Sequence, residues 1–176
     1  MSTTEGPTLE TARLRLRRYR HEDFDAYAAM WADPAVVRFI NGVPFTREQC
    51  WQRFLRHAGH WQFMDFGTFR LEDKATGAFV GECGFHDLKR QVVPSLEGTM
   101  ESGWALTAAY QGKGLAEEAM RAAIDWAHGN GVGPRLTCMI DTGNGASLRV
   151  AAKLGFTEFA RTDYLGKPVI LLERPR

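Results

Sequence analysis

The strongest constraint on the fold is a strand-like stretch that leads through a glycine-containing turn into a long amphipathic helix. Residues 99–107, TMESGWALT, alternate between two faces, which is the period of a strand. Residues 110–120, YQGKGLAEEAM, place Gly112 and Gly114 where a helix begins, and helical apolar spacing continues until the breakers GNGVGP. The sequence therefore predicts a strand, a turn that uses the conformational freedom of glycine, and a helix.

The start of this helix is a candidate site for a phosphate group. A helix N-terminus has N–H groups without intrahelical partners and the positive end of the helix dipole, and glycine lets a phosphate approach closely. Two nucleotide signatures do not fit: G-x-x-x-x-G-K-[ST] is absent, and G-x-G-x-x-G fails because Glu117 occupies the place of the third glycine. From the glycines alone, a plain turn and a phosphate loop both remain open.

The other patterns predict a mixed sheet covered by helices. Residues 12–18 alternate like a strand, and two helices follow, the second with a capping box at Thr46 and Gln49. The tryptophans of this region are interpreted as core residues, in preference to a cleft lining. The later expected elements are a hairpin (66–85), a strand (136–140), a helix (144–154) and two closing strands around Gly166. This order predicts a single α+β domain over residues 1–176, with residues 1–9 flexible.

Composition argues against several classes of function. The chain has 176 residues and a formal charge of +1, so the basic excess typical of nucleic-acid binding is absent. No window reaches the ~20 apolar residues that span a bilayer, and the N-terminus lacks a signal-peptide pattern, which predicts a cytoplasmic protein without a membrane partner. Three separated cysteines indicate reduced, buried thiols, and His57 and His60 lack a third ligand, so no metal is expected.

Four ordered segments resemble the GCN5-related N-acetyltransferase (GNAT) superfamily. The pattern Gln111-x-x-Gly114-x-Ala116 is similar to the superfamily's pyrophosphate-binding signature at the start of its central helix. LETARLRLR, the hairpin with DKATG and GECGF, ESGWAL and NGASLRVAAKLGF are similar to the RimJ/RimL-like ribosomal-protein N-terminal acetyltransferases. The resemblance covers nearly the whole chain and implies a layered α/β/α fold, with a mostly antiparallel mixed sheet of about six or seven strands and about four helices.

The resemblance also implies that acetyl-CoA is bound as the acetyl donor. The backbone amides of residues 112–116 would hold the pyrophosphate, and the preceding strand end would pair with the pantetheine arm. Such pairing needs an opened sheet, so we expect the fourth and fifth strands to diverge near Trp104, where Gly103 favours a bulge. The implied coenzyme-binding residues are Ala105, Leu106, Thr107, Gln111, Gly112, Lys113, Gly114, Leu115, Ala116 and Asn144.

Direct acetyl transfer needs a neutral amine, stabilisation of an oxyanion and a proton for the departing thiolate. By resemblance, the oxyanion donor is a backbone N–H near Ala105 or Leu106. Glu101 of ESGW is the implied base and acts through water, with Glu82 and His86 as alternatives. A solvated strand carboxylate is the competing interpretation of Glu101.

The proton donor is less clearly indicated. Many members of the superfamily have a Tyr seven residues after the Asn of the last helix, and this chain has Ala151 there. Ser147 is implied as the acid by resemblance to the ribosomal-protein subgroup. Capping of the helix by Asn144 also explains the presence of Asn144 and Ser147 and is compatible with a role in catalysis.

We therefore expect an acetyl-CoA-dependent N-acetyltransferase that modifies a primary amine of a protein N-terminus or a small molecule, and a homodimer by analogy. Two other classes remain open: a catalytically inactive acyl-CoA-binding module of the same fold and, less favoured, a nucleotide binder. Glu82, Asp87, Glu97 and Glu101 cluster around the third and fourth strands and predict a cationic acceptor.

Overall fold

The structure, a computed structural model, describes residues 6–132 and 135–175, which form an eight-stranded sheet in the order β1-β2-β3-β4-β5-β6-β8-β7. Neighbouring strands are antiparallel except β5 and β6, which are parallel. The strands are β1 (Leu9–Glu10), β2 (Leu14–Arg17), β3 (Thr68–Asp73), β4 (Phe79–His86), β5 (Met100–Leu106), β6 (Leu136–Asp141), β7 (Thr157–Tyr164) and β8 (Lys167–Arg174).

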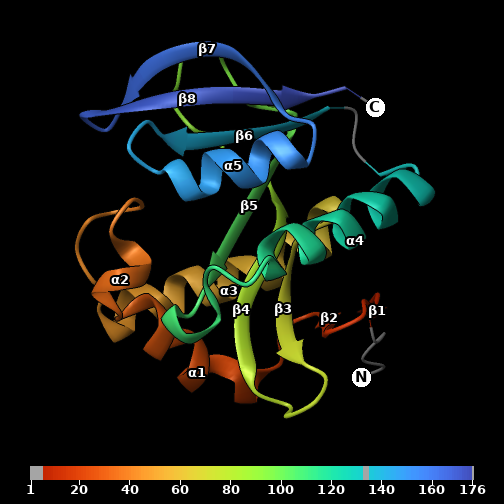
Figure 1. Cartoon of the computed structure of the whole chain (residues 1–176). Helices are drawn as coiled ribbons and strands as arrows, with labels where there is room; N and C mark the ends of the chain where they lie inside the picture. Colours follow the sequence, from red (N-terminus) through yellow and green to blue (C-terminus); the bar gives the residue numbers. More distant parts are fainter. Residues whose placement is uncertain (1–5, 133–134, 176) are drawn as a thin grey trace.

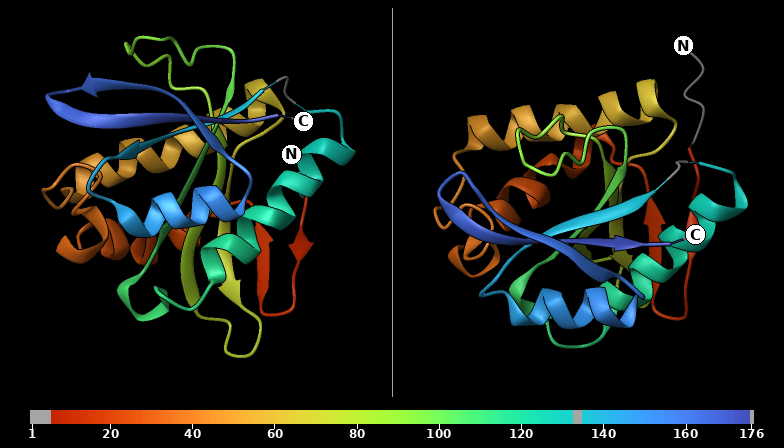
Figure 2. Two further views of the ribbon diagram at one scale, coloured as in Figure 1. Left: turned by 45° about the horizontal axis from the view of Figure 1, so that its top comes forward. Right: turned by 90° about the horizontal axis from the view of Figure 1, so that it is seen from above.

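Helices cover both faces of the sheet (Figures 1 and 2). In the view of Figure 1, α4 and α5 lie in front of the sheet, whereas α3 passes behind it and packs against α1. The α-helices are α1 (Phe24–Trp31), α2 (Pro34–Val37), α3 (Arg47–Met64), α4 (Leu115–Gly129) and α5 (Gly145–Lys153). Two short 3₁₀ helices, η1 (His21–Asp23) and η2 (Ala108–Tyr110), complete the described elements.

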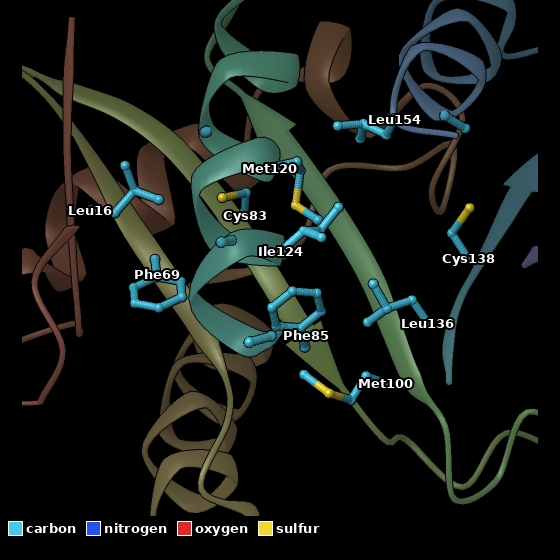
Figure 3. Close-up of a cluster of buried hydrophobic side chains, with 14 of the residues drawn as sticks. Leu16, Phe69, Cys83, Phe85, Met100, Met120, Ile124, Leu136, Cys138 and Leu154 are labelled. Atoms are coloured by element: carbon cyan, nitrogen blue, oxygen red, sulfur yellow. The ribbon is translucent and has the colours of Figure 1, made fainter. Parts of the chain in front are cut away.

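The larger hydrophobic core lies between α4 and the sheet. Figure 3 shows Met120 and Ile124 of α4 over Phe85 of β4 and Met100 of β5, and none of these side chains is more than 2% exposed. Burial of each such side chain contributes about 1.5–3 kcal/mol. This packing fixes the N-terminus of α4 beside the end of β5.

A second core lies between α1, α2 and α3, where Tyr27, Trp31 and Phe54 are buried together. Trp31 and Trp61 are only 2% and 5% exposed, which confirms the interpretation of these tryptophans as core residues.

The three cysteines are free and buried, as expected. Within the described ranges, no helix has the length and apolar character needed to cross a bilayer.

The predicted order of elements is confirmed, and the structure adds two short ones. Pro34 occupies the first turn of the added helix α2, and Asp33 caps that turn by accepting a hydrogen bond from the Ala35 N–H at 2.8 Å. In β1, Leu9 pairs with Leu16, which gives the sheet one more strand than expected. Of the residues expected to be flexible, 1–5 lie outside the described ranges.

Candidate active site

β5 and β6 separate after only two paired positions, Met100 with Leu136 and Glu101 with Thr137. β5 then continues along β4, whereas β6 continues along β8 (Figure 1). We call the opening between residues 102–106 of β5 and the diverging β6 the fork. The predicted splaying of these strands is confirmed, although it begins before Trp104.

No bulge is present at Gly103, contrary to expectation, because the register between β4 and β5 continues through it without a shift. Instead, the glycine makes room for a neighbouring side chain. A Cβ atom at this position would lie 3.0 Å from Cε1 of His86, a tight contact that would require the imidazole to shift by a few tenths of an ångström. Gly103 therefore permits the observed close approach of His86 to β5.

The backbone of β5 presents alternate residues to the fork. The Met100 N–H donates to the Arg135 carbonyl on the β6 side, and the Thr107 N–H donates to the Val80 carbonyl on the β4 side. Because adjacent residues of a strand point their N–H and C=O groups to opposite sides, Ser102, Trp104 and Leu106 direct theirs into the fork. Of the three residues expected at the pantetheine, Leu106 faces the fork, whereas Ala105 and Thr107 direct their backbone groups to β4.

The loop between η2 and α4 lies at the open end of β5. Gly112 and Gly114 have φ values of +73° and +75°, a left-handed conformation that explains why glycine is needed at both positions. Within the described part of the chain, the N–H groups of residues 112–114 donate no hydrogen bond, and residues 111–114 are exposed. Gln111 has a structural role that the sequence did not indicate: its Nε2 donates to the Leu106 carbonyl at 2.9 Å and folds the loop back onto β5.

Contacts between residues 11–13 and the first turn of α4 hold this loop from its other side. Glu118, in the first turn of α4, accepts hydrogen bonds from Thr11 Oγ1 at 2.6 Å and from the Arg13 backbone N–H at 2.9 Å. Arg13 Nε also donates to Glu118, and its Nη1 donates to the Lys113 carbonyl at 3.0 Å. These contacts use a carbonyl group of the loop and leave its N–H groups unbonded. More than 100 residues separate the partners, so no local pattern could have revealed the tether.

Glu101 lies at the closed end of the fork, and its carboxylate is fully engaged. The side chain is buried, and Arg90 Nε donates to both carboxylate oxygens at 2.8 and 3.0 Å. Nε2 of His86 lies 3.2 Å from Oε1, without the direction of a good hydrogen bond. Burial opposes ionisation, but the nearby His86 and Arg90 outweigh it and lower the pKa of Glu101 to about 2. Glu101 is thus a permanently charged, ion-paired group and not the solvated carboxylate of the competing interpretation.

The His86 side chain is more accessible than that of Glu101. Its side chain is 21% exposed, compared with 6% for Glu101. Desolvation lowers the pKa of the His86 imidazole, although the negative charge of Glu101 acts in the opposite direction. The imidazole is therefore largely neutral at neutral pH and is able to accept a proton.

Asn144 and Ser147 lie at the start of α5, which follows β6 on the other side of the fork. Asn144 caps the helix, because its Oδ1 accepts a hydrogen bond from the Ser147 N–H at 3.1 Å. Both residues are half-buried, and no hydrogen bond among the described residues links Ser147 to Glu101. Ala151, at the position where many members of the superfamily have Tyr, is completely buried.

The carboxylates expected to attract a cationic acceptor all have partners within the chain. Lys89 Nζ lies 2.8 Å from Asp87 and 3.2 Å from Glu97. Glu82 accepts a hydrogen bond from Tyr19 Oη at 2.8 Å and lies 3.5 Å from His57 Nε2. With Glu101 paired to Arg90, cations of the chain offset part of the negative potential inferred from the sequence.

Comparison with known proteins gives one family. The model of the acetyltransferase (GNAT) domain matches residues 13–157. The uncharacterized protein YkkB of Bacillus subtilis (strain 168) is 29% identical over 174 residues, which cover 94% of each chain. A solved structure described as a putative GNAT-family acetyltransferase from Bordetella pertussis has a TM-score of 0.84 and 31% identity, and the match covers 96% of this chain and 99% of that one.

The expected likeness to the ribosomal-protein acetyltransferases is present at the level of the fold. RimL, described as a ribosomal L7/L12 alpha-N-protein acetyltransferase and solved in complex with coenzyme A, has a TM-score of 0.78 and 15% identity. The match covers 96% of this chain and 97% of that structure.

Proposed function

The chain belongs to the GNAT acetyltransferase family, and on this premise we propose that it transfers the acetyl group of acetyl-CoA directly to a primary amine of a protein N-terminus or a small molecule. One observation carries the proposal: the unpaired edge of β5 ends at a loop whose N–H groups are free. An extended amide chain with a phosphate at one end matches this combination of an open strand edge and an anion site.

In the proposed complex, the pyrophosphate accepts hydrogen bonds from the backbone amides of residues 112–116. The peptide-like pantetheine arm pairs with Trp104 and Leu106, which direct their backbone groups into the fork. Ala105 and Thr107 contribute by holding β5 against β4, and Asn144 borders the site from α5. The thioester then lies toward the closed end of the fork, near Glu101.

The reaction proceeds by direct attack. The nitrogen of the neutral amine forms a bond to the thioester carbonyl carbon, and the resulting oxyanion accepts a hydrogen bond from a backbone N–H of the fork-facing set. Collapse of the tetrahedral intermediate breaks the C–S bond. In this proposal the Ser147 hydroxyl protonates the departing thiolate, and the proton lost by the amine passes to the group at the closed end of the fork.

Within that group, His86 is the better proton acceptor. Transfer from an α-ammonium group, with a pKa of ~8, to a carboxylate with a pKa of about 2 is uphill by about 8 kcal/mol. The gap to the neutral imidazole of His86 is much smaller. We therefore propose that His86 accepts the proton, directly or through water, while the negative charge of Glu101, 3.2 Å away, stabilises the imidazolium that forms.

Thiol release from acetyl-CoA over a panel of primary amines tests this function. The kcat/KM of the wild type should rise with pH through a pKa below 6.5, because only neutral His86 acts as a base. His86→Gln should abolish this limb. Glu101→Gln should move this rise to lower pH, because the negative charge that raises the pKa of His86 is lost.

Ser147→Ala tests the proposed proton donor and should slow turnover. His128→Gln is the matched control, because His128 is an exposed histidine at the end of α4, and this variant should keep the turnover and pH profile of the wild type.

The results separate the alternatives. If His86→Gln and Glu101→Gln both leave the pH dependence of kcat/KM unchanged, neither residue takes part in the mechanism. Binding of coenzyme A without thiol release for any amine would favour the inactive acyl-CoA-binding module, which is compatible with the alanine at position 151. A protein that binds no coenzyme A would refute the proposed function itself.

A further inference from the structure

Two arginines of α3 have no carboxylate partner among the residues that the structure describes. Arg53 lies over the rings of Trp31 and Phe45, with its guanidinium carbon 4.4 and 4.6 Å from their centroids, and its buried Nε has no hydrogen-bond acceptor. Arg56 is exposed, and no carboxylate of the described residues lies within ion-pair distance of it. The carboxylates of the same region differ, because each has a hydrogen-bond or ion-pair partner within 3.5 Å.

Their place on α3 directs them toward the reacting end of the fork. Arg53, Arg56 and His60 are three and four residues apart, so they form one stripe on the helix. His60 accepts a hydrogen bond from the Asp87 N–H at 3.2 Å, and its ring centroid lies 6.4 Å from that of His86. The stripe therefore faces the end of β4, where His86 and the paired Glu101 lie.

Electrostatics agree with this geometry. Desolvation, followed by the positive charge of Arg53, lowers the pKa of the Arg56 guanidinium, and Arg90 acts in the same direction. Arg56 in turn lowers the pKa of His86. Glu82 acts in the opposite direction on the pKa of Arg56, and these interactions show that Arg56 lies near Arg53, Arg90 and the proposed base.

We propose that the acceptor amine carries a carboxylate close to its amino group, and that Arg56, with Arg53 beside it, binds this carboxylate. The inference rests on the proposed function and specifies its substrate class as an amino acid or an acidic peptide. A guanidinium binds a carboxylate through two parallel, charge-assisted hydrogen bonds. The same cations disfavour the protonated form of a nearby amine, so they raise the fraction of acceptor that is able to attack the thioester.

The test compares acceptors of similar size that carry a carboxylate, a neutral amide or an ammonium group, with rates expressed per neutral amine. We suggest alanine against alaninamide, and dipeptide amides of alanine followed by glutamate, glutamine or lysine, each with saturating acetyl-CoA. The carboxylate-bearing member should have a kcat/KM about tenfold or more above its neutral analogue, and the lysine dipeptide should be the poorest acceptor. Arg56→Gln should raise KM for the carboxylate acceptors about tenfold or more and change the kcat/KM of the amides much less, so that the preference for a carboxylate is lost.

Arg47→Gln is the matched control, because Arg47 is an exposed arginine of the same helix that pairs with Asp25 away from the stripe. Equal or better use of the amide or lysine acceptors would overturn the inference, and so would carboxylate preference that survives Arg56→Gln. If no amine reacts, the proposed function fails, and a binding measurement decides the inference separately. Calorimetric titration of N-acetylalanine and N-acetylalaninamide into the protein with coenzyme A should then favour the carboxylate, and equal affinities would refute the inference.

Discussion

Replacement of Glu101 by glutamine tests the ion pair at the closed end of the fork. Glu101→Gln keeps the size of the side chain and removes the charge held by Arg90 and His86. The pKa of Glu101 lies at about 2, against an ordinary value of 4.5. A difference of this size corresponds to about 3 kcal/mol of stability at pH 7, which agrees with the 3–5 kcal/mol range for loss of one partner of a buried ion pair.

The effect should depend on pH in a defined direction. Because the pKa of Glu101 is lower in the folded protein, its contribution is complete above pH 4.5 and decreases as the pH falls toward 2. The difference between wild type and variant should therefore decline from about 3 kcal/mol at pH 7 to about 1 kcal/mol at pH 3.

Urea unfolding followed by tryptophan fluorescence at several pH values measures both quantities. Glu158→Gln is the control, because Glu158 forms an exposed, solvent-screened pair with Arg161 and its loss should leave the stability nearly unchanged at every pH. A Glu101→Gln variant as stable as the wild type at pH 7, or a loss of stability that is the same at pH 3 and pH 7, would refute the reasoning.

Three further predictions concern packing and the loop. Phe69 is completely buried against Trp61, so Phe69→Ala should cost about 3–5 kcal/mol in urea unfolding, and a cost below about 1 kcal/mol would contradict the packing. Gly114→Ala should cost about 1–2 kcal/mol because of its positive φ and should weaken acetyl-CoA binding in calorimetry; Gly129→Ala, where φ is not positive, should leave binding unchanged. Ser102→Ala should leave stability unchanged or improved because the buried Oγ has no hydrogen-bond partner, and a clear loss would reveal a missed bond.

Local sequence patterns predicted the elements that depend on neighbouring residues. The capping box of Thr46 and Gln49, the alternation of β2 and the helix that begins after Gly114 are all present, because spacing within one element determines them. The short elements β1 and α2 were not anticipated. β1 depends on its tertiary pairing with β2, and α2 is a single turn of four residues that begins at Pro34, too short to give a periodic pattern.

The chemistry of the site was less predictable, because its electrostatics come from distant partners. Glu101 stood out in the sequence, but the Arg90 that binds it lies in an irregular loop. Likewise, Glu82, Asp87, Glu97 and Glu101 predicted a negative surface, because the sequence does not show which side chains pair with them. Unpaired Arg56 lies on a helix that the sequence indicated only as a source of core residues.

Hydrogen exchange in the presence and absence of acetyl-CoA tests the central claim most directly. If the coenzyme lies along the free edge of β5 with its pyrophosphate on the loop, amides of residues 102–116 should exchange more slowly in the complex. Amides of the hairpin formed by β7 and β8 should be unaffected. Protection confined to another part of the sheet, or no protection of residues 102–116 at saturating acetyl-CoA, would contradict the proposed binding mode.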